Sequence, residues 1–498
     1  MAVKQKLLLC AGAILATAVT FSVPVEAKKK RQNSSVPQAI SAAEKQEGAK
    51  AHPEILREFG GNYESAQTAY VVRVGKSIAV QSGLGNAESD FTVSFLNSPV
   101  NNAFAIPGGY IYITRQLAAL CNSEAEMAGV LGHEVGHVAA RHGKKRQKRA
   151  TLAGILGAVG TIGGSLLGDK GGLAGLLGGA AKQYSGTLAQ VFTLSYSRGQ
   201  EEEADDLGIK YLSSAGYDPT ALSDMLASLA MQSALDSRAA GQEARSVPEW
   251  ASTHPDPIKR VARAATSAQK YSASSIRKQD THFAAIDKML YGDDPKQGVI
   301  EGQDFLHPDL RLKFSAPVGF GMQNSSQAVL INGTGGKALF STAAYSGDKQ
   351  AYIDAAFKAV SGEQKLNYSA ISQTTINGIP AFYSTATVAT QNGGSNSVTV
   401  FAYEFSATQA FHFVAIMPAN ASPFAGMFQS VRRLSKADAD GILPRKIKIV
   451  TVGKNDTIST LASKMAYSNL QSERLMALNG WRSGYAPKSG SKAKIVVY

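Results

Sequence analysis

The feature that most constrains the fold of this chain is a helix with the sequence H-E-V-G-H at residues 133–137. Ser123 and Glu126 form the S-x-x-E pattern of a capping box at its start, and apolar residues follow at helical spacing up to residue 141. Gly143 is the expected stop. The sequence therefore predicts a helix over about residues 123–141 that contains the H-E-V-G-H motif.

Two histidines four residues apart lie on the same face of a helix. His133 and His137 can therefore bind one metal ion through their imidazoles, and Glu134 lies beside them. A catalytic zinc ion has three protein ligands and one position for water. The chain therefore needs a third ligand from another part of its sequence.

An acidic cluster at residues 201–205 is the candidate source of that ligand. It lies in the first turns of a second predicted helix, over about residues 197–214. Glu201 and Asp205 share a face of this helix, so one carboxylate can coordinate metal while the other binds the second nitrogen of a ligand histidine. Acidic residues at a helix start also complement the helix dipole, but the upstream H-E-V-G-H motif favours the ligand interpretation.

Four segments of the chain, taken in order, resemble peptidase family M48, the HtpX-like and CAAX-prenyl-protease-like zinc metalloendopeptidases. The segments are NAFAIPGGYIYITR, HEVGH, SRGQEEEADDLG and STHPDPIKR, within about residues 50–270. Within this family the chain is most similar to the soluble periplasmic (BepA-like) branch. The multiple membrane spans of the HtpX branch are not expected here, so membrane-embedded substrates are not expected either. The resemblance implies a mainly helical, zincin-type metalloprotease domain with a small edge-strand sheet, at residues 28–275.

The resemblance also implies roles for individual residues. It selects Glu201 as the third ligand of one zinc ion per chain and gives Asp205 a supporting role. It places His254 and Arg260 near the metal, as further donors to the oxyanion that forms during hydrolysis. Zinc would lower the pKa of a bound water toward ~7, and Glu134 would take its proton and deliver it to the leaving amine.

The segment before the metal-binding helix predicts a strand, a Pro-Gly-Gly turn and a second, β-branched strand. The first strand would be an edge strand on which an extended peptide adds as a further strand. Binding through the backbone is loosely selective for sequence and suits unfolded or misassembled proteins. The residues expected to contact substrate are Asn102, Ala103, Phe104 and Ala105, in a strand that continues to Ile106.

The N-terminus has the three regions of a secretory signal peptide. Lys4 and Lys6 precede the charge-free apolar segment 7–23, and small residues follow up to Ala27. We therefore expect residues 1–27 to be removed and the mature chain to lie in the periplasm or cell envelope. The alternative is an uncleaved anchor.

A glycine-rich, uncharged segment at residues 150–168 is nearly long enough to span a membrane. Its frequent glycines and the charged pair at residues 169–170 favour a helical hairpin or a lid over a cleft instead. Membrane contact through residues 150–182 is the alternative interpretation.

The C-terminal half predicts two further domains. Residues 300–435 alternate aromatic and β-branched residues with turns and contain one helix near residues 351–360, which predicts a small α+β domain of unknown role. Residues 445–498 resemble a LysM module of βααβ order, with the segments IVTVGKNDTISTLASKM, LMALNGW and KAKIVVY. This second resemblance implies binding to peptidoglycan or another envelope glycan that contains N-acetylglucosamine.

Residues 445–498 are strongly basic, with ten Lys/Arg and two Asp/Glu, a net charge of +8. We expect them to retain the enzyme on wall material, so that truncation after Pro444 leaves peptide hydrolysis intact. The alternative is a basic cap that stabilises the protease.

These features predict an α+β multidomain protein that acts as a zinc-dependent metalloendopeptidase on misfolded or misassembled proteins of the cell envelope. A zinc hydrolase of peptidoglycan and a non-enzymatic envelope chaperone or scaffold are the alternatives. The net charge of +13, from 51 Lys/Arg and 38 Asp/Glu, is compatible with an anionic partner. We do not expect nucleic acid to be that partner, because the chain is exported and its basic run at residues 144–149 has no interleaved aromatic residues.

Overall fold

The protein is described from a computed structural model. The described residues are 39–84, 87–145, 196–239, 254, 257–271, 273–361, 366–389 and 394–498. The predicted signal peptide, the glycine-rich segment 150–182 and most of the basic run at 144–149 lie outside them. None of the described helices combines the length and the apolar composition needed to cross a bilayer.

A three-stranded sheet lies at the centre of the N-terminal domain. Its strands are β1 (Thr92–Leu96), β2 (Ala103–Ile106) and β3 (Tyr110–Thr114), in the order β1-β3-β2. β2 and β3 are antiparallel and are joined by a turn at the predicted Pro-Gly-Gly segment. The turn requires glycine, because Gly108 and Gly109 have φ angles of 91° and 82°.

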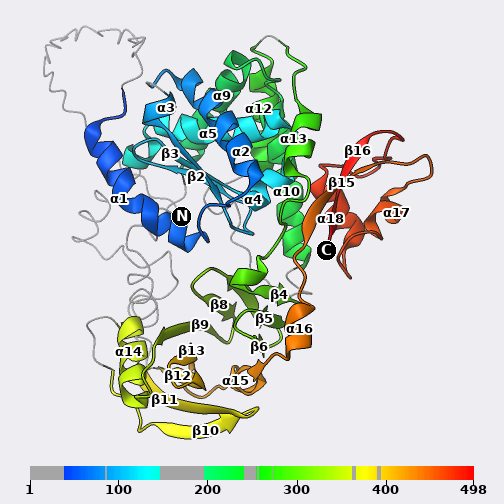
Figure 1. The fold of residues 1–498 in the computed structure, drawn as a ribbon. Helices are drawn as coiled ribbons and strands as arrows, with labels where there is room; N and C mark the ends of the chain where they lie inside the picture. Colours follow the sequence, from blue (N-terminus) through cyan, green and yellow to red (C-terminus); the bar gives the residue numbers. More distant parts are fainter. Residues whose placement is uncertain are drawn as a thin grey trace, which may run out of the picture. The chain divides into compact units, whose positions relative to one another are not determined.

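Helices surround this sheet, and α5, which contains the H-E-V-G-H motif, lies among them (Figure 1). It contacts β2, α2, α9 and α10, so its side chains are buried along almost its whole length. The helices are α1 (Ala42–Glu58), α2 (Ala66–Ala79), η1 (Val80–Ser82), α3 (Ala87–Asp90), α4 (Arg115–Leu120), α5 (Glu124–Ala139), α9 (Arg198–Ser214), α10 (Ala221–Ala239), α12 (Pro257–Ala268) and α13 (Gln279–Ile286).

The two ends of α5 differ in detail from the sequence prediction. Ser123 is the N-cap and accepts a hydrogen bond from the backbone of Glu126, as predicted. The Glu126 carboxylate instead accepts from the backbone of Asn122 at 2.8 Å, so the capping box is not reciprocal. At the other end Arg141, not Gly143, adopts the left-handed conformation, with a φ angle of 53°. The Arg141 side chain compensates for this conformation by donating to the carbonyl of Ala39 at 2.9 Å.

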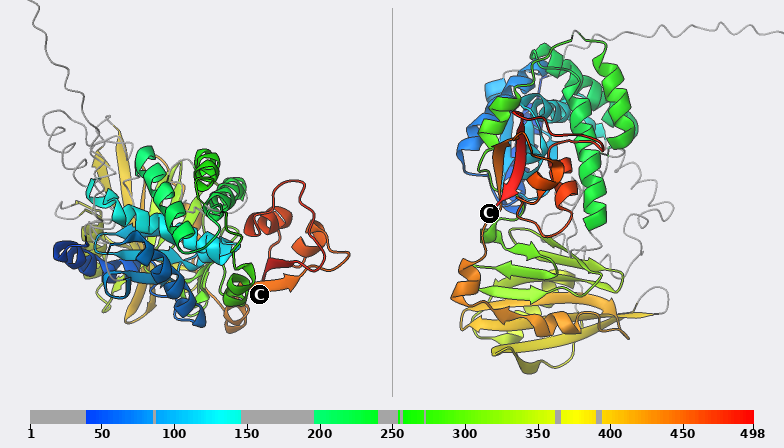
Figure 2. Two further views of the ribbon diagram at one scale, coloured as in Figure 1. Left: turned by 90° about the horizontal axis from the view of Figure 1, so that it is seen from above. Right: turned by 90° about the vertical axis from the view of Figure 1, so that its right-hand side faces the viewer.

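The second domain is built on two antiparallel sheets, and its strands form the layers coloured green to orange in Figure 2. The predicted helix is α14 (Lys349–Ser361), and α15 (Ala425–Ser430) is a second, short helix. The seven-stranded sheet has the order β10-β11-β12-β13-β9-β8-β7, with β7 (Gly321–Asn324), β8 (Val329–Gly333), β9 (Gly336–Ala344), β10 (Ser372–Ile376), β11 (Ile379–Ala389), β12 (Ser395–Ser406) and β13 (Gln409–Pro418). The four-stranded sheet has the order β14-β6-β5-β4, with β4 (Val299–Glu301), β5 (Asp304–His307), β6 (Leu312–Ser315) and β14 (Arg432–Arg433).

The C-terminal segment has the βααβ order that the sequence predicts. A short helix, α16 (Lys436–Asp440), precedes it. β15 (Lys446–Thr451) pairs antiparallel with β16 (Lys492–Val497), and α17 (Ile458–Ala462) and α18 (Gln471–Leu478) lie between them in sequence. The element order agrees with the LysM resemblance, and glycan binding stays a prediction.

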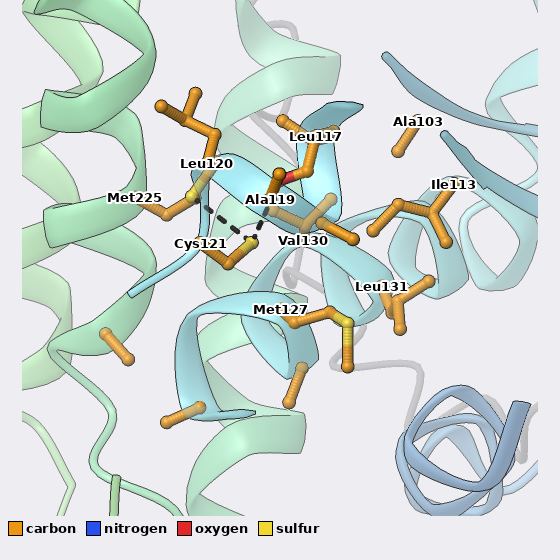
Figure 3. Packing of buried hydrophobic residues seen from close by; sticks show 14 of the residues in the cluster. Ala103, Ile113, Leu117, Ala119, Leu120, Cys121, Met127, Val130, Leu131 and Met225 are labelled. Carbon is orange, nitrogen blue, oxygen red and sulfur yellow. Dashed lines mark hydrogen bonds between the residues drawn. The ribbon is translucent and has the colours of Figure 1, made fainter. Parts of the chain in front are cut away.

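This βααβ module is not a separable tail, because it shares one hydrophobic core with the N-terminal domain. Ile447, Leu475 and Ile495 belong to the same buried cluster as Leu117, Met225 and other residues of α4, α5 and α10. Figure 3 shows part of this cluster around Cys121, whose thiol lies 3.4 Å from the Leu117 carbonyl and 3.6 Å from the Met225 sulfur. The shared core argues against the expectation that truncation leaves the protease intact and favours the stabilising-cap alternative.

Candidate metal centre

Two helices, α5 and α9, meet at the candidate site, and glycines let them pack closely. A Cβ on Gly136 would lie 3.0 Å from the carbonyl oxygen of Ala204, and a Cβ on Gly208 would lie 3.0 Å from the backbone nitrogen of His133. Larger residues at these positions would push the helices apart. The close packing brings the acidic turns of α9 against the H-E-V-G-H residues of α5.

Four buried side chains converge between these elements, and each offers one ligand atom within 4.8 Å of the others. The Nε2 atoms of His133 and His137 lie 3.0 Å apart. Glu201 Oε1 lies 3.4 Å from His137 Nε2. The Nδ1 atom of His254 lies 3.2 Å from both carboxylate oxygens of Glu201. The structure thus brings together the three predicted ligands and His254, which the resemblance also placed near the metal.

Asp205 determines where the proton of His133 lies. Its Oδ1 atom is 3.0 Å from His133 Nδ1, so Nδ1 carries the proton and donates it. Burial alone would raise the pKa of Asp205, but hydrogen bonds from Arg260 and His133 outweigh this effect and lower it. Asp205 is therefore an ionised acceptor, and His133 presents its Nε2 lone pair to the centre, as the sequence led us to expect of a carboxylate at this position.

His142 sets the tautomer of His137 in the same way. The sequence analysis did not predict this role of His142. His142 Nε2 lies 3.1 Å from Glu203 Oε2, and its Nδ1 lies 2.8 Å from His137 Nδ1. Burial lowers the pKa of both imidazoles, so both are neutral. His142 then donates from Nε2 to Glu203 and accepts at Nδ1, and His137 presents its own Nε2 lone pair to the centre.

Arg260 joins the two carboxylates of α9. Its Nε and Nη2 atoms donate to Asp205 at 2.8 and 2.6 Å, and its Nη1 atom donates to Glu201 at 2.5 Å. Burial opposes the ionisation of Glu201, but the charge of His254 and the hydrogen bond that His254 donates help to hold the pKa of Glu201 well below the usual range. Arg260 lies near the centre as expected, but its donors point to carboxylates. The geometry therefore favours a positioning role over the expected role as an oxyanion donor.

Glu134 lies beside the converging ligands with its carboxylate buried. Within the described part of the chain, neither of its oxygens has a hydrogen-bond partner. Its Oε1 atom lies 3.6 Å from His254 Nε2, and burial raises the pKa of the carboxyl. A buried carboxylate without a donor is costly, so such a group indicates a missing polar partner such as a water molecule.

The donor set fits a zinc ion. Two imidazole lone pairs and a carboxylate are the ligand types of a catalytic zinc site. Nitrogen lone pairs that face each other at 3.0 Å repel unless a cation or a proton lies between them. His133, His137 and Glu201 would hold the ion, and the position of Glu134 suits a water molecule bound to it.

β2 lies at an edge of its sheet in the order of the described strands, as predicted. Its residues are buried, and Ala105 and Ile106 line a small pocket together with His137. The strand therefore runs beside the metal centre. Contact between substrate and the predicted residues Asn102, Ala103, Phe104 and Ala105 stays a prediction.

The domain is helical, has a small sheet with an edge strand, and brings the two histidines of an HExxH motif together with a glutamate. These features define its class: it is a metallopeptidase domain. Residues 65–268 match the model of Peptidase family M48, which agrees with this class.

Curated relatives agree with this assignment. The Beta-barrel assembly-enhancing protease of Yersinia pestis is 31% identical over 239 residues, 47% of this chain and 46% of that protein. The protein of the same name in Escherichia coli (strain K12) is 28% identical over 226 residues, 45% of this chain and 43% of that protein. The Mitochondrial metalloendopeptidase OMA1 of Schizosaccharomyces pombe is 29% identical over 226 residues, 44% of this chain and 59% of that protein. The chain spans about half the length of the first two relatives.

Proposed function

We propose that this protein is a zinc-dependent metalloendopeptidase of the cell envelope that hydrolyses misfolded or misassembled envelope proteins. The observation that carries the proposal is the convergence of His133, His137 and Glu201 beside the buried carboxylate of Glu134. Two relatives are named for β-barrel assembly, and these names support envelope proteins as the substrates. The signal peptide pattern at residues 1–27 supports export.

A bound zinc ion supplies a water molecule acidified to a pKa of about 7 and polarises the peptide carbonyl. The residues of the chain perform the proton transfers. Glu134 takes the proton of this water and passes it to the leaving amine. Asp205 and His142 hold the ligand histidines in the tautomer that binds metal, and Arg260 fixes the carboxylate of Glu201.

Peptide binding is assigned to β2. An extended polypeptide that pairs with this strand is held through its backbone, so its sequence matters little. Such binding favours an unfolded segment, because a folded protein pairs or protects most of its extended backbone. This preference directs hydrolysis to misfolded proteins.

His254 is assigned to the control of the fourth metal position. Its Nδ1 atom lies 3.4 Å from His133 Nε2 and 3.2 Å from Glu201, within reach of the ion that these residues would hold. As a ligand it would occupy the position of the catalytic water. Displaced by substrate, it would be close enough to donate a hydrogen bond to the oxyanion.

The test compares wild type with Glu134→Gln in the hydrolysis of denatured casein and of purified wall sacculi. We expect the variant to bind as much zinc as wild type and to lose ~10²-fold or more of its casein hydrolysis, because the proton acceptor is removed. Retained casein hydrolysis would contradict the mechanism. Hydrolysis of sacculi with no hydrolysis of casein would favour the peptidoglycan-directed alternative.

A further inference from the structure

A small pocket lies next to the metal centre. β2 contributes Ala105 and Ile106 to its wall, α5 contributes His137 and Val138, and the segment before α1 contributes Ile40. Pro107, Gly108, Gly143 and Tyr196 also line the pocket, together with the charged side chains of Glu44, Arg141 and Lys144, which pair with one another. The pocket therefore lies along the strand assigned to substrate, with an apolar wall beside β2 and paired charges at the end of α5.

Ile40 comes from the first described residues of the chain, far in sequence from the other walls. It is buried, with 7% of its surface exposed, and belongs to the main hydrophobic cluster. A Cβ on Gly109 would lie 2.9 Å from its Cδ1 atom, so the side chain packs tightly against the β2–β3 turn.

Ion pairs hold the Ile40 segment against the end of α5. The Glu44 carboxylate lies 3.0 Å from Lys144 Nζ and 3.5 Å from Arg141 Nε. Arg141 also donates to the carbonyl of Ala39 at 2.9 Å. Arg141 adopts an unfavourable left-handed conformation at this point, which the surrounding contacts have to stabilise. Glu44 is thus a positioning residue for Ile40.

We propose that this pocket binds an apolar side chain of the peptide that pairs with β2, and that Ile40 determines which side chains fit. The inference rests on the proposed peptidase function and adds a substrate class to it. The side chains of a peptide paired with β2 would alternate between the two faces of the sheet, and the pocket is lined by Ala105 and Ile106 of β2 together with His137 of α5. The preferred substrates would therefore have an apolar side chain close to the bond that is cut.

The test is the cleavage-site profile of the zinc-loaded full-length protein on a library of unfolded peptides. Ile40→Ala enlarges the pocket, and we expect kcat/KM for peptides with Phe or Met at the selected position to rise about tenfold relative to those with Val. Ile40→Val removes a single methyl group and should shift the profile in the same direction by less. Glu44→Gln should also shift the cleavage-site profile, because this substitution weakens the ion pairs that hold the Ile40 segment against α5.

Val318→Ala is the matched control, because Val318 is 91% exposed in the second domain. It should leave the profile unchanged. Variants of Ile40 that retain zinc and hydrolysis but cut at the same sites as wild type would overturn the subsite proposal alone. A wild-type protein no more active than Glu134→Gln would instead overturn the peptidase function on which the proposal rests.

Discussion

At the residue scale, the centre depends on the proton positions of two histidines. His133 donates to Asp205 and His137 donates to His142, so both Nε2 lone pairs face the space beside Glu201. A histidine in the other tautomer would direct an N–H group at the metal and could not bind it. The residues around the ligands therefore contribute to metal binding through the tautomers that they impose.

The ionisation of Glu44 should make the stability of the folded protein depend on pH in the acidic range. Burial alone would raise its pKa, but hydrogen bonds from Ser41 and the charges of Lys144 and Arg141 lower it to about 2, from an ordinary value of 4.5. Because the folded-state pKa is depressed, the stabilisation is complete above 4.5 and is lost as the pH falls toward 2. We expect the melting temperature of wild type to fall more than that of Glu44→Gln between about pH 5 and pH 3. Parallel curves for the two proteins would contradict this assignment.

At the scale of elements, the corner between α4 and α5 is stabilised by side chains from distant parts of the chain. Lys494 of β16 is fully buried and donates to the carbonyls of Ala119, Leu120 and Cys121 at 2.7, 3.1 and 2.7 Å. The Nε2 atom of His282 lies 3.1 Å from the carbonyl of Cys121. The last carbonyls of a helix have no partner within the helix, so these donors satisfy groups that would otherwise be buried without hydrogen bonds.

Replacement of Lys494 should therefore destabilise the N-terminal domain. Lys494→Met approximately keeps the length of the side chain but removes the donor of the Ala119 and Leu120 carbonyls, while the Cys121 carbonyl keeps its contact with His282. We expect the free energy of unfolding to fall by about 2 kcal/mol or more, since each unsatisfied buried group costs ~1–3 kcal/mol. Lys492→Met is the matched control, because Lys492 lies on the same strand and forms an ion pair with exposed Asp280. Denaturant unfolding should show little change for the control, and equal losses for both variants would contradict the prediction.

The same elements show what the sequence alone could predict. The capping residue Ser123 and the i, i+4 spacings in α5 and α9 are local, so the sequence predicted both helices and the ligands on them. The resemblance to a known family then selected Glu201 over its acidic neighbours. The roles of His142 and Lys494 depend on contacts between segments distant in sequence or on the geometry of a helix end. No spacing rule encodes such contacts, so these residues were not predicted.

At the scale of the whole molecule, the βααβ module is part of the protease. Its hydrophobic residues complete the core around α4, α5 and α10, and Gly480 lies where a Cβ would meet Asn122 and Ser228 at 3.1 Å. Seven of the ten Lys and Arg side chains of the module are exposed, so binding of an anionic or glycan partner stays a prediction that the shared core does not contradict. Retention on wall material and stabilisation of the protease are therefore compatible roles.

Truncation after Pro444 is expected to abolish the folded peptidase. It would expose the apolar surface that Ile447, Leu475 and Ile495 cover, and it would remove the donor Lys494. We expect the truncated protein to aggregate or to show no cooperative thermal transition, with no zinc-dependent hydrolysis. A truncated protein that is soluble, melts cooperatively and cleaves casein at the wild-type rate would contradict the shared core.

The central claim is that one zinc ion held by His133, His137 and Glu201 makes this chain a peptidase. The most direct test is a zinc titration of the metal-free protein, with hydrolysis of an unfolded peptide as the readout. We predict that activity rises linearly and reaches its maximum at about one zinc per chain, the number that a single three-ligand site binds. The Glu201→Gln protein should gain no activity over the same range. Full hydrolysis by the metal-free protein, or wild-type activation of Glu201→Gln at one equivalent of zinc, would contradict the claim.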